Sequence, residues 1–196
     1  MSVEELPVVH ALIDLCAALK ITCIVQVGAE DGYEVYKLKQ ALGCLAIAID
    51  PDPSCAPIST KIEFHEVLIG AEDTVADFYW NRVPGHSTQI PRIDGMEIKL
   101  TLPQSRLDTF CKRFGIVPDA LLIDTEGTTL DVLEGCGDLL DNVRLVYAEC
   151  QTVELRPGMR LLPEVDTFLA ERGFVQRAGL PAYSVGDQGN YTWVRS

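Results

Sequence analysis

Apolar residues form two alternating patterns along this chain, short continuous runs and stripes of helical spacing. The first stripe places Val8, Leu12, Leu15 and Leu19 on one face, which predicts an amphipathic helix over residues 4–20. The continuous runs predict buried strands at residues 21–27, 45–49, 63–69, 121–123 and 143–148. Later stripes predict helices at residues 33–42, 105–114 and 163–173, and around Leu130 and Leu133.

Alternating strands and helices predict an α/β fold with a doubly wound, mostly parallel sheet. Four further segments are expected to be extended: 75–80, 96–102, 174–178 and 191–194. Ser105 is expected to cap the helix that follows it. No repeat or linker divides the chain, so residues 1–196 are expected to form one domain, an N-terminal helix (1–20) before a core (21–196).

The turn after the first strand reads VGAEDG and has a GxxxG pattern, with Gly28 and Gly32 at its ends. Glycine at a strand end lets a ligand approach the backbone, and the next helix offers free N–H groups. Dinucleotide sites have GxGxxG instead, and the acids Glu30 and Asp31 inside this turn disfavour a diphosphate. The turn suits a ligand with a cationic centre, such as S-adenosylmethionine, or has only a structural role.

A second acid follows the second strand. Asp50 lies 18 positions after Gly32, and in nucleotide-binding α/β folds an acid near this point accepts hydrogen bonds from ribose hydroxyls. The alternative is a turn-forming acid before Pro51. The glycine turn at this spacing favours the binding role.

The stretch LLIDTEGTTLDVLEG, residues 121–135, places two acids between a buried strand and a helix. Ligands of open α/β sheets bind beyond the carboxyl ends of the strands, so Asp124 and Glu126 are candidates for catalysis. Glu126 is either a general base or a cap for the helix. With Glu149, which ends the next strand, the two acids could instead hold a divalent cation.

Histidine supplies a further candidate base, because it titrates near neutral pH. His86 lies in the segment PGHSTQ beside Ser87 and Thr88, which could also contact a ligand. His65 lies in the third predicted strand, where a structural role is favoured.

The charge balance restricts the partners. The chain has 29 acids and 16 bases, a formal net charge of −13, and no basic patch. Such a surface repels phosphate backbones and anionic lipids, so we expect neither nucleic-acid nor membrane binding.

Three further features predict a cytoplasmic protein with reduced thiols. Glu4 and Glu5 stand where a secretory signal would be basic, and no apolar run approaches the roughly 20 residues of a membrane span. The seven cysteines are scattered without a CxxC pair, which favours buried thiols over a zinc site. We therefore predict no metal site.

The motifs together resemble the FkbM family of S-adenosylmethionine-dependent methyltransferases. VQVGAEDGYE resembles the family's DVGANxGxY, AIDPDP its FEPxP, RLDTF its TLDD segment, and LLIDTEGTTLDVLEG its LKIDVEGAELEVLKG. VYAEC and FLAERGF are similar to a later strand and helix. The resemblance extends from Ile24 to about Val194.

This resemblance implies a Rossmann-like fold with seven strands, the final one antiparallel, and S-adenosylmethionine as cofactor. It places Gln26, Gly28, Ala29 and Gly32 at the methionine moiety and Asp50 at the ribose. Glu66 or Val67 would flank the adenine. Asp124 and Glu126 would stand at the methyl-transfer site, with Asp124 also near the cofactor. His86 is a further candidate base there on the chemistry of histidine, not on the resemblance.

Two residues depart from the family pattern: Gln26 stands in place of Asp, and Leu122 in place of Lys. They motivate an alternative, a degenerate methyltransferase fold that serves as a non-catalytic binding module. The favoured hypothesis is O-methylation of a hydroxyl on a small molecule or sugar, with an acceptor pocket built from residues 79–95 and 179–190. The sequence leaves open whether the chain forms a homo-oligomer.

Overall fold

The computed structural model describes residues 5–81, 87–91, 97–177 and 184–196. The helices are α1 (Glu5–Ala18), α2 (Tyr33–Leu42), α3 (Leu107–Phe114), α4 (Thr129–Glu134), the 3₁₀ helix η1 (Gly137–Asn142) and α5 (Leu162–Ala170). The strands are β1 (Cys23–Val27), β2 (Leu45–Ile49), β3 (Glu63–His65), β4 (Leu68–Gly70), β5 (Thr74–Trp80), β6 (Ile98–Arg106), β7 (Ala120–Ile123), β8 (Leu145–Gln151), β9 (Phe174–Gln176), β10 (Ser184–Val185) and β11 (Gln188–Arg195).

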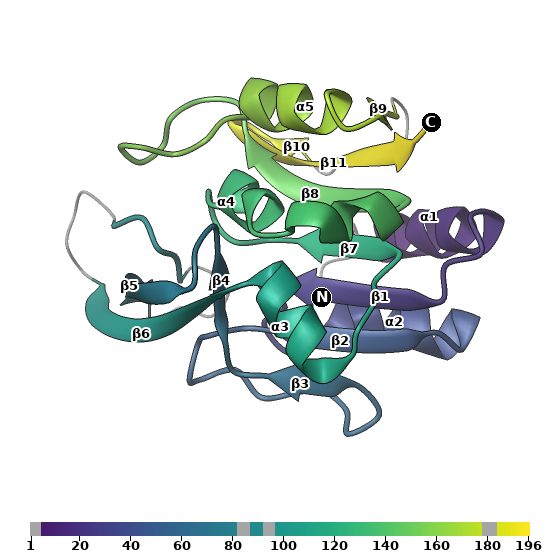
Figure 1. Ribbon diagram of the computed structural model, residues 1–196, viewed down its shortest axis with the longest axis horizontal. Coiled ribbons are helices and arrows are strands. Elements are labelled where there is room, and N and C mark those ends of the chain that lie inside the picture. Colours follow the sequence, from purple (N-terminus) through teal and green to yellow (C-terminus); the bar gives the residue numbers. More distant parts are fainter. Residues whose placement is uncertain (1–4, 82–86, 92–96, 178–183) are drawn as a thin grey trace.

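The main sheet has the order β10-β11-β8-β7-β1-β2-β3, with β9 also paired to β11 (Figure 1). The strands β3, β2, β1, β7 and β8 are parallel, and β11 runs antiparallel to β8. The predicted doubly wound, mostly parallel sheet with an antiparallel final strand is therefore confirmed. The carboxyl ends of β1, β2 and β7 meet at one edge, as the motifs required.

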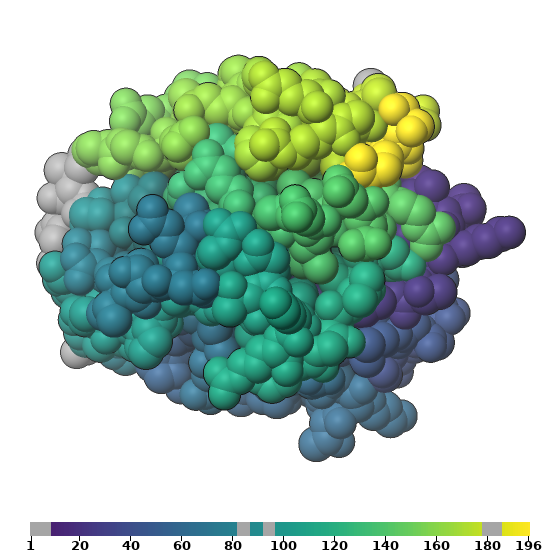
Figure 2. All heavy atoms as spheres, in the orientation of Figure 1, coloured from purple at the N-terminus to yellow at the C-terminus, as the bar shows by residue number. Residues whose placement is uncertain are grey.

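Successive side chains of each strand point to opposite sides of this sheet, so apolar strands give it two apolar faces. Helices cover both of these faces. Ile24 belongs to the core beneath α1 and α2, whereas Val25 belongs to the core beneath α3, α4 and α5. Figure 2 shows the second face, where teal and green side chains close over the sheet and the purple helix α1 lies at one end. Both faces are buried, which explains why the strands read as continuous apolar runs.

A second, smaller sheet has the order β4-β6-β5 and lies beyond the carboxyl ends of the main strands (Figure 1). The prediction of one strand over 63–69 was wrong. Residues 63–65 pair with β2, but Leu68–Gly70 pair with β6, so the chain leaves one sheet for the other at Glu66 and Val67.

The predicted cap at Ser105 was also wrong. Ser105 is still part of β6, paired with Ile69, and α3 begins only at Leu107. The hydroxyl of Ser105 donates to Asp73, which also accepts a hydrogen bond from the Thr109 hydroxyl on α3. Asp73, which comes from another segment, therefore supplies the hydrogen-bond acceptor at the start of this helix.

Six of the seven cysteines are buried, Cys55 is half-buried, and all seven are free thiols. Among the described residues, no helix has the length and apolar character needed to cross a bilayer.

Asp119 holds together the amino end of the sheet, opposite the motif edge. Its carboxylate accepts hydrogen bonds from the backbone N–H groups of Thr22 and Cys23 and from the Thr22 hydroxyl. Arg144 at the start of β8 forms an ion pair with it at 2.8 Å. Burial favours the neutral acid, but these donors outweigh burial and lower the pKa of Asp119.

We expect Asp119→Ala to lower the free energy of unfolding by about 2 kcal/mol at neutral pH, because several donors lose a charged acceptor. Since the pKa is lowered in the folded state, this stabilisation is present at neutral pH and is lost as the pH falls through the acid range. Urea denaturation at two pH values measures both effects. Asp141→Ala, at an exposed position, is the control. Equal effects of the two variants would contradict the role of Asp119.

Candidate functional site

A cavity lies at the carboxyl edge of the main sheet, between that edge and the small sheet. The strand ends supply most of its wall, and β4 and β5 supply Leu68, Ile69 and Phe78. The other lining residues are Gln26, Val27, Gly28, Ala29, Glu30, Glu34, Asp50, Pro51, Asp52, Cys55, Ser87, Gln89, Asp124, Thr125, Glu126 and Thr128. Six of them are acids, and none of the described lining residues is basic. The cavity is therefore strongly negative and suits a cationic ligand better than a phosphate.

Gly28 places the glycine turn against the turn that follows β7. Its φ is +73°, and an added Cβ would lie 1.6 Å from the carbonyl oxygen of Asp124. The Asp124 N–H in turn donates to Val27. The two turns thus touch through their backbones, and only glycine permits this approach.

Asp50 connects the glycine turn to the segment after β2. Its two carboxylate oxygens accept hydrogen bonds from the backbone N–H groups of Glu30 and Asp52, at 2.8 and 2.9 Å. Burial raises the pKa of Asp50 to about 6, although these two bonds oppose the shift. Each oxygen retains acceptor capacity toward the cavity, which Asp50 lines.

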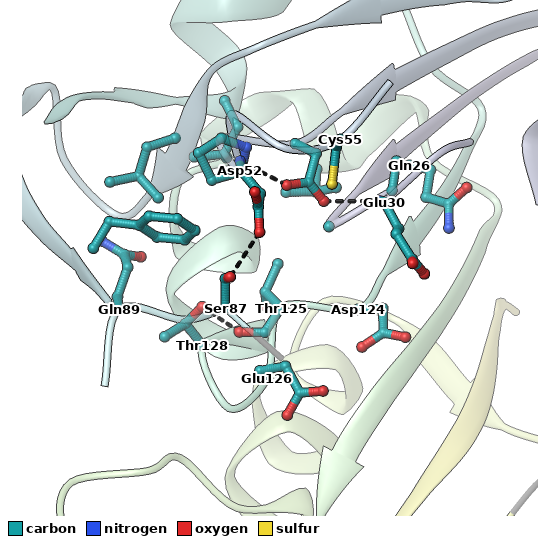
Figure 3. Close-up of a pocket in the computed structure, with 18 of the residues that line it drawn as sticks. Gln26, Glu30, Asp52, Cys55, Ser87, Gln89, Asp124, Thr125, Glu126 and Thr128 are labelled. Carbon is teal, nitrogen blue, oxygen red and sulfur yellow. Dashed lines mark hydrogen bonds between the residues drawn. The ribbon is translucent and has the colours of Figure 1, made fainter. Parts of the chain in front are cut away.

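Residues 87–91 pass beside the cavity and are bonded to both of its walls. The Ser87 hydroxyl donates to Asp52 at 2.7 Å (Figure 3). The Trp80 indole donates to the same carboxylate. On the other wall, the Thr88 hydroxyl donates to the backbone carbonyl of Glu126. These bonds hold Ser87 and Gln89 at the cavity.

Three carboxylates form a cluster, two from the turn after β7 and one from the carboxyl-terminal part of β8. Ligand oxygens of Asp124, Glu126 and Glu149 all lie within 4.8 Å of one another. Glu149 is oriented by amide donors from Gln151 and Gln188. Carboxylate oxygens are the ligands that Mg²⁺ and Ca²⁺ prefer, so the cluster could hold such a cation or a shared proton.

Burial and mutual repulsion disfavour full ionisation of this cluster. Asp124 is accessible through the cavity but otherwise enclosed, and this enclosure, then Glu149 and Glu126, raises its pKa well above the usual value. Burial and then Glu126 raise the pKa of Glu149. The cluster can therefore accept and release a proton nearer neutral pH than isolated carboxylates can.

Backbone strain accompanies these acids. Glu30 and Glu126 have φ values of +49° and +52°, which side-chain-bearing residues seldom adopt. Figure 3 shows their carboxylates and that of Asp124 around one open space. Strained residues of this kind cluster at functional sites.

Gln26 contributes an unused acceptor. It is 5% exposed, and its amide nitrogen donates to Glu34 at 3.2 Å. Its Oε1 has no hydrogen-bond partner in the described part of the chain. A buried carbonyl oxygen without a donor is costly, which indicates that a ligand supplies one.

A family model described as the methyltransferase FkbM domain matches residues 26–175. The chain belongs to the FkbM methyltransferase family. A comparison with curated proteins found no match.

Solved methyltransferase structures resemble this FkbM domain in fold. Magnesium protoporphyrin IX methyltransferase from Synechocystis PCC 6803 with bound SAM has a TM-score of 0.55 at 12% identity, over 99% of this chain and 81% of the other. A putative O-methyltransferase from Klebsiella pneumoniae has a TM-score of 0.56 at 11% identity, over 100% and 82%. At these identities the likeness concerns the fold alone.

The FkbM domain brings together most of the residues predicted from its motifs. Gln26, Gly28, Ala29, Asp50, Asp124 and Glu126 all line the cavity. Gly32 instead precedes α2 and faces Ala48 and Ile62, behind the lining.

The remaining predicted residues lie elsewhere. Glu66 is exposed and Val67 packs against the core, so neither lines the cavity. His86 lies outside the described residues. His65 bonds to Glu63 and makes an edge-to-face contact with Phe110, in agreement with a structural role.

Sequence reasoning did not assign Asp52, Glu34 or Gln89 to the site. The DPDP segment contained a signal for Asp52, since it lies two residues after Asp50 in the same turn. Glu34 lies in the first turn of α2, where an acid is also explained by the helix dipole. No feature of the sequence indicated that Gln89 lines the cavity.

The first test concerns the Gly28 contact. Gly43→Ala is the matched control, because Gly43 also has a positive φ (+68°) but no atom within 4 Å of an added Cβ. We expect Gly43→Ala to cost about 1 kcal/mol from φ alone, and Gly28→Ala about 3 kcal/mol because the two turns must also separate. Chemical denaturation gives both values, and equal losses would refute the contact.

The second test concerns Asp50. Its pKa is 3.8 ordinarily and about 6 in the folded state, so the folded protein binds the proton more tightly. The contribution of Asp50 to the free energy of unfolding should be greatest below its ordinary pKa. It should decrease as the pH rises through the pKa of the folded state. Between about pH 4.5 and 7.5, wild type should lose about 2 kcal/mol more than Asp50→Asn. Parallel pH dependences of urea unfolding would exclude the raised pKa.

Proposed function

We propose that this protein is an S-adenosylmethionine-dependent methyltransferase that methylates a hydroxyl oxygen of a small molecule or sugar. The observation that carries the proposal is the cavity at the carboxyl edge, lined by six acids and no described basic residue. A sulfonium cofactor is stabilised in such a field, whereas a pyrophosphate is repelled. Family membership supports the same cofactor.

The residues present fit this cofactor at each of its parts. Gln26 Oε1 has no donor among the described residues, and an α-ammonium group would supply one. Asp50 offers acceptor lone pairs for two ribose hydroxyls. Leu68, Ile69 and Phe78 form an apolar wall suited to an adenine ring. Solved structures of the same fold contain SAM or SAH.

When bound, the cofactor supplies an electrophilic methyl group and leaves as a neutral thioether once the acceptor oxygen has taken that methyl. The contribution of the protein is then proximity, orientation and removal of the hydroxyl proton. Asp124 and Glu126 border the cavity, and Glu149 completes their cluster. Because their repulsion favours binding of one proton, we assign the proton of the acceptor hydroxyl to this cluster. His86 stays a proposed alternative base.

Calorimetric titration tests the cofactor. We expect S-adenosylmethionine to bind, and its affinity to rise between about pH 5.5 and 7.5, because ionised carboxylates favour the sulfonium charge. S-adenosylhomocysteine lacks that charge and should show a smaller pH dependence, which Asp50→Asn should reduce further. No binding at about millimolar ligand, or the same pH dependence for both ligands, would overturn the assignment.

Turnover tests the acids, with S-adenosylhomocysteine release measured over a panel of hydroxyl compounds. Glu126→Gln and Asp124→Asn should lower kcat by about 100-fold, the contribution of a general base. Asp138→Asn, at an exposed position of η1, is the control and should match the wild type. If both cavity variants keep wild-type turnover while the cofactor binds, the cluster is not the base.

A further inference from the structure

A second cavity lies on the α1–α2 side of the main sheet and has a volume of about 230 Å³. Its wall comes from six elements, with the residues Val9, Leu12, Gln26, Glu34, Leu122, Ile123, Asp124, Tyr147, Glu149 and Asn190. A water molecule occupies about 30 Å³ of liquid volume, so this space admits a small organic molecule. Of the described residues in the segments 79–95 and 179–190, which the sequence suggested for an acceptor, Asn190 lines this cavity.

The two cavities share one wall. Gln26, Glu34 and Asp124 line both of them. Gln26 Nε2 bonds to Glu34, so these two side chains form a connected partition, and Asp124 stands at the end of the neighbouring strand. A ligand in the second cavity would therefore contact the side chains that border the methionine end of the first. The partition also carries the Gln26 oxygen for which the described part of the chain offers no donor.

The second cavity has an apolar part and an acidic part. Val9 and Leu12 of α1 and Leu122 of β7 line the apolar part and are 7%, 3% and 2% exposed, so this part is shielded from bulk solvent. The acidic part holds Glu34, Asp124 and Glu149. None of the described lining residues is basic. An anionic ligand would thus meet carboxylates without a compensating cation, which costs free energy.

We propose that the second cavity binds the methyl acceptor, and that this acceptor is a compact hydroxyl compound with an apolar body and no negative charge. The inference rests on the proposed function and adds the position and chemical class of the acceptor. The apolar body lies against Val9, Leu12 and Leu122. The hydroxyl points to the partition, where Asp124 and Glu149 accept its hydrogen bond and its proton.

Three probes of one skeleton test the class: tyramine, 4-ethylphenol and 4-hydroxyphenylacetate differ mainly in the charge of the side chain. Binding is measured by calorimetry with the protein saturated with S-adenosylhomocysteine. We expect tyramine and 4-ethylphenol to bind, and 4-hydroxyphenylacetate to bind at least about tenfold more weakly because of repulsion. Equal or tighter binding of the anion, or no binding of any probe, would overturn the proposal.

A variant pair tests the position. Val9→Trp fills the cavity from α1, whereas Ala17→Trp places the same side chain at an exposed position of the same helix. Val9→Trp should weaken 4-ethylphenol binding by at least about tenfold, and Ala17→Trp should not change it. If circular dichroism shows that Val9→Trp does not fold, Leu12→Phe replaces it. Unchanged probe binding in the folded cavity variant would place the acceptor elsewhere.

Cofactor titration of the same variants separates this inference from the proposed function. Val9 lines only the second cavity, so Val9→Trp should retain the wild-type affinity for S-adenosylmethionine. Failure of the wild type to bind S-adenosylmethionine would refute the function itself. Cofactor binding without any effect of Val9→Trp on the probes would refute the acceptor site alone.

Discussion

The contact between the turn after β1 and the turn after β7 is the constraint on which the site depends. Gly28 approaches the carbonyl of Asp124 so closely that no Cβ could stand between them. Because the Gly28 and Ala29 N–H groups also donate to the carbonyl of Ile49, the ends of β2, β1 and β7 are joined in one series of backbone contacts. The relative positions of the strand end that carries Asp50, the glycine turn and the turn that carries Asp124 therefore follow from main-chain geometry. These positions depend little on side-chain flexibility.

Charge at this edge sets the chemistry and opposes stability. Desolvation and repulsion raise the pKa values of Asp50, Asp124 and Glu149, so each acid is less stable in its charged form than it would be in water. A positively charged ligand reverses that penalty. The two left-handed glutamates add backbone strain to the same region. The arrangement that suits a charged ligand therefore lowers the stability of the ligand-free protein.

How far sequence reasoning reached depended on the range of the interactions involved. The order of the strands and the acids at their ends, Asp50 and Asp124, were predictable because strand ends meet at one edge in any parallel sheet. The change of sheet within 63–69 was not, since Leu68–Gly70 pair with residues more than thirty positions away. Gln89 and the second cavity depend on how distant segments pack against the edge, for which no local pattern exists.

Asp119 and the donors that bond to it lie at the opposite edge of the same strands. There the acid is matched by donors and by Arg144, and its pKa is lowered, whereas the acids at the carboxyl edge have raised values. Stability and chemistry are therefore separated along the strand direction. The interactions at the amino edge therefore contribute folding free energy that offsets the backbone strain and the charge repulsion at the cavity.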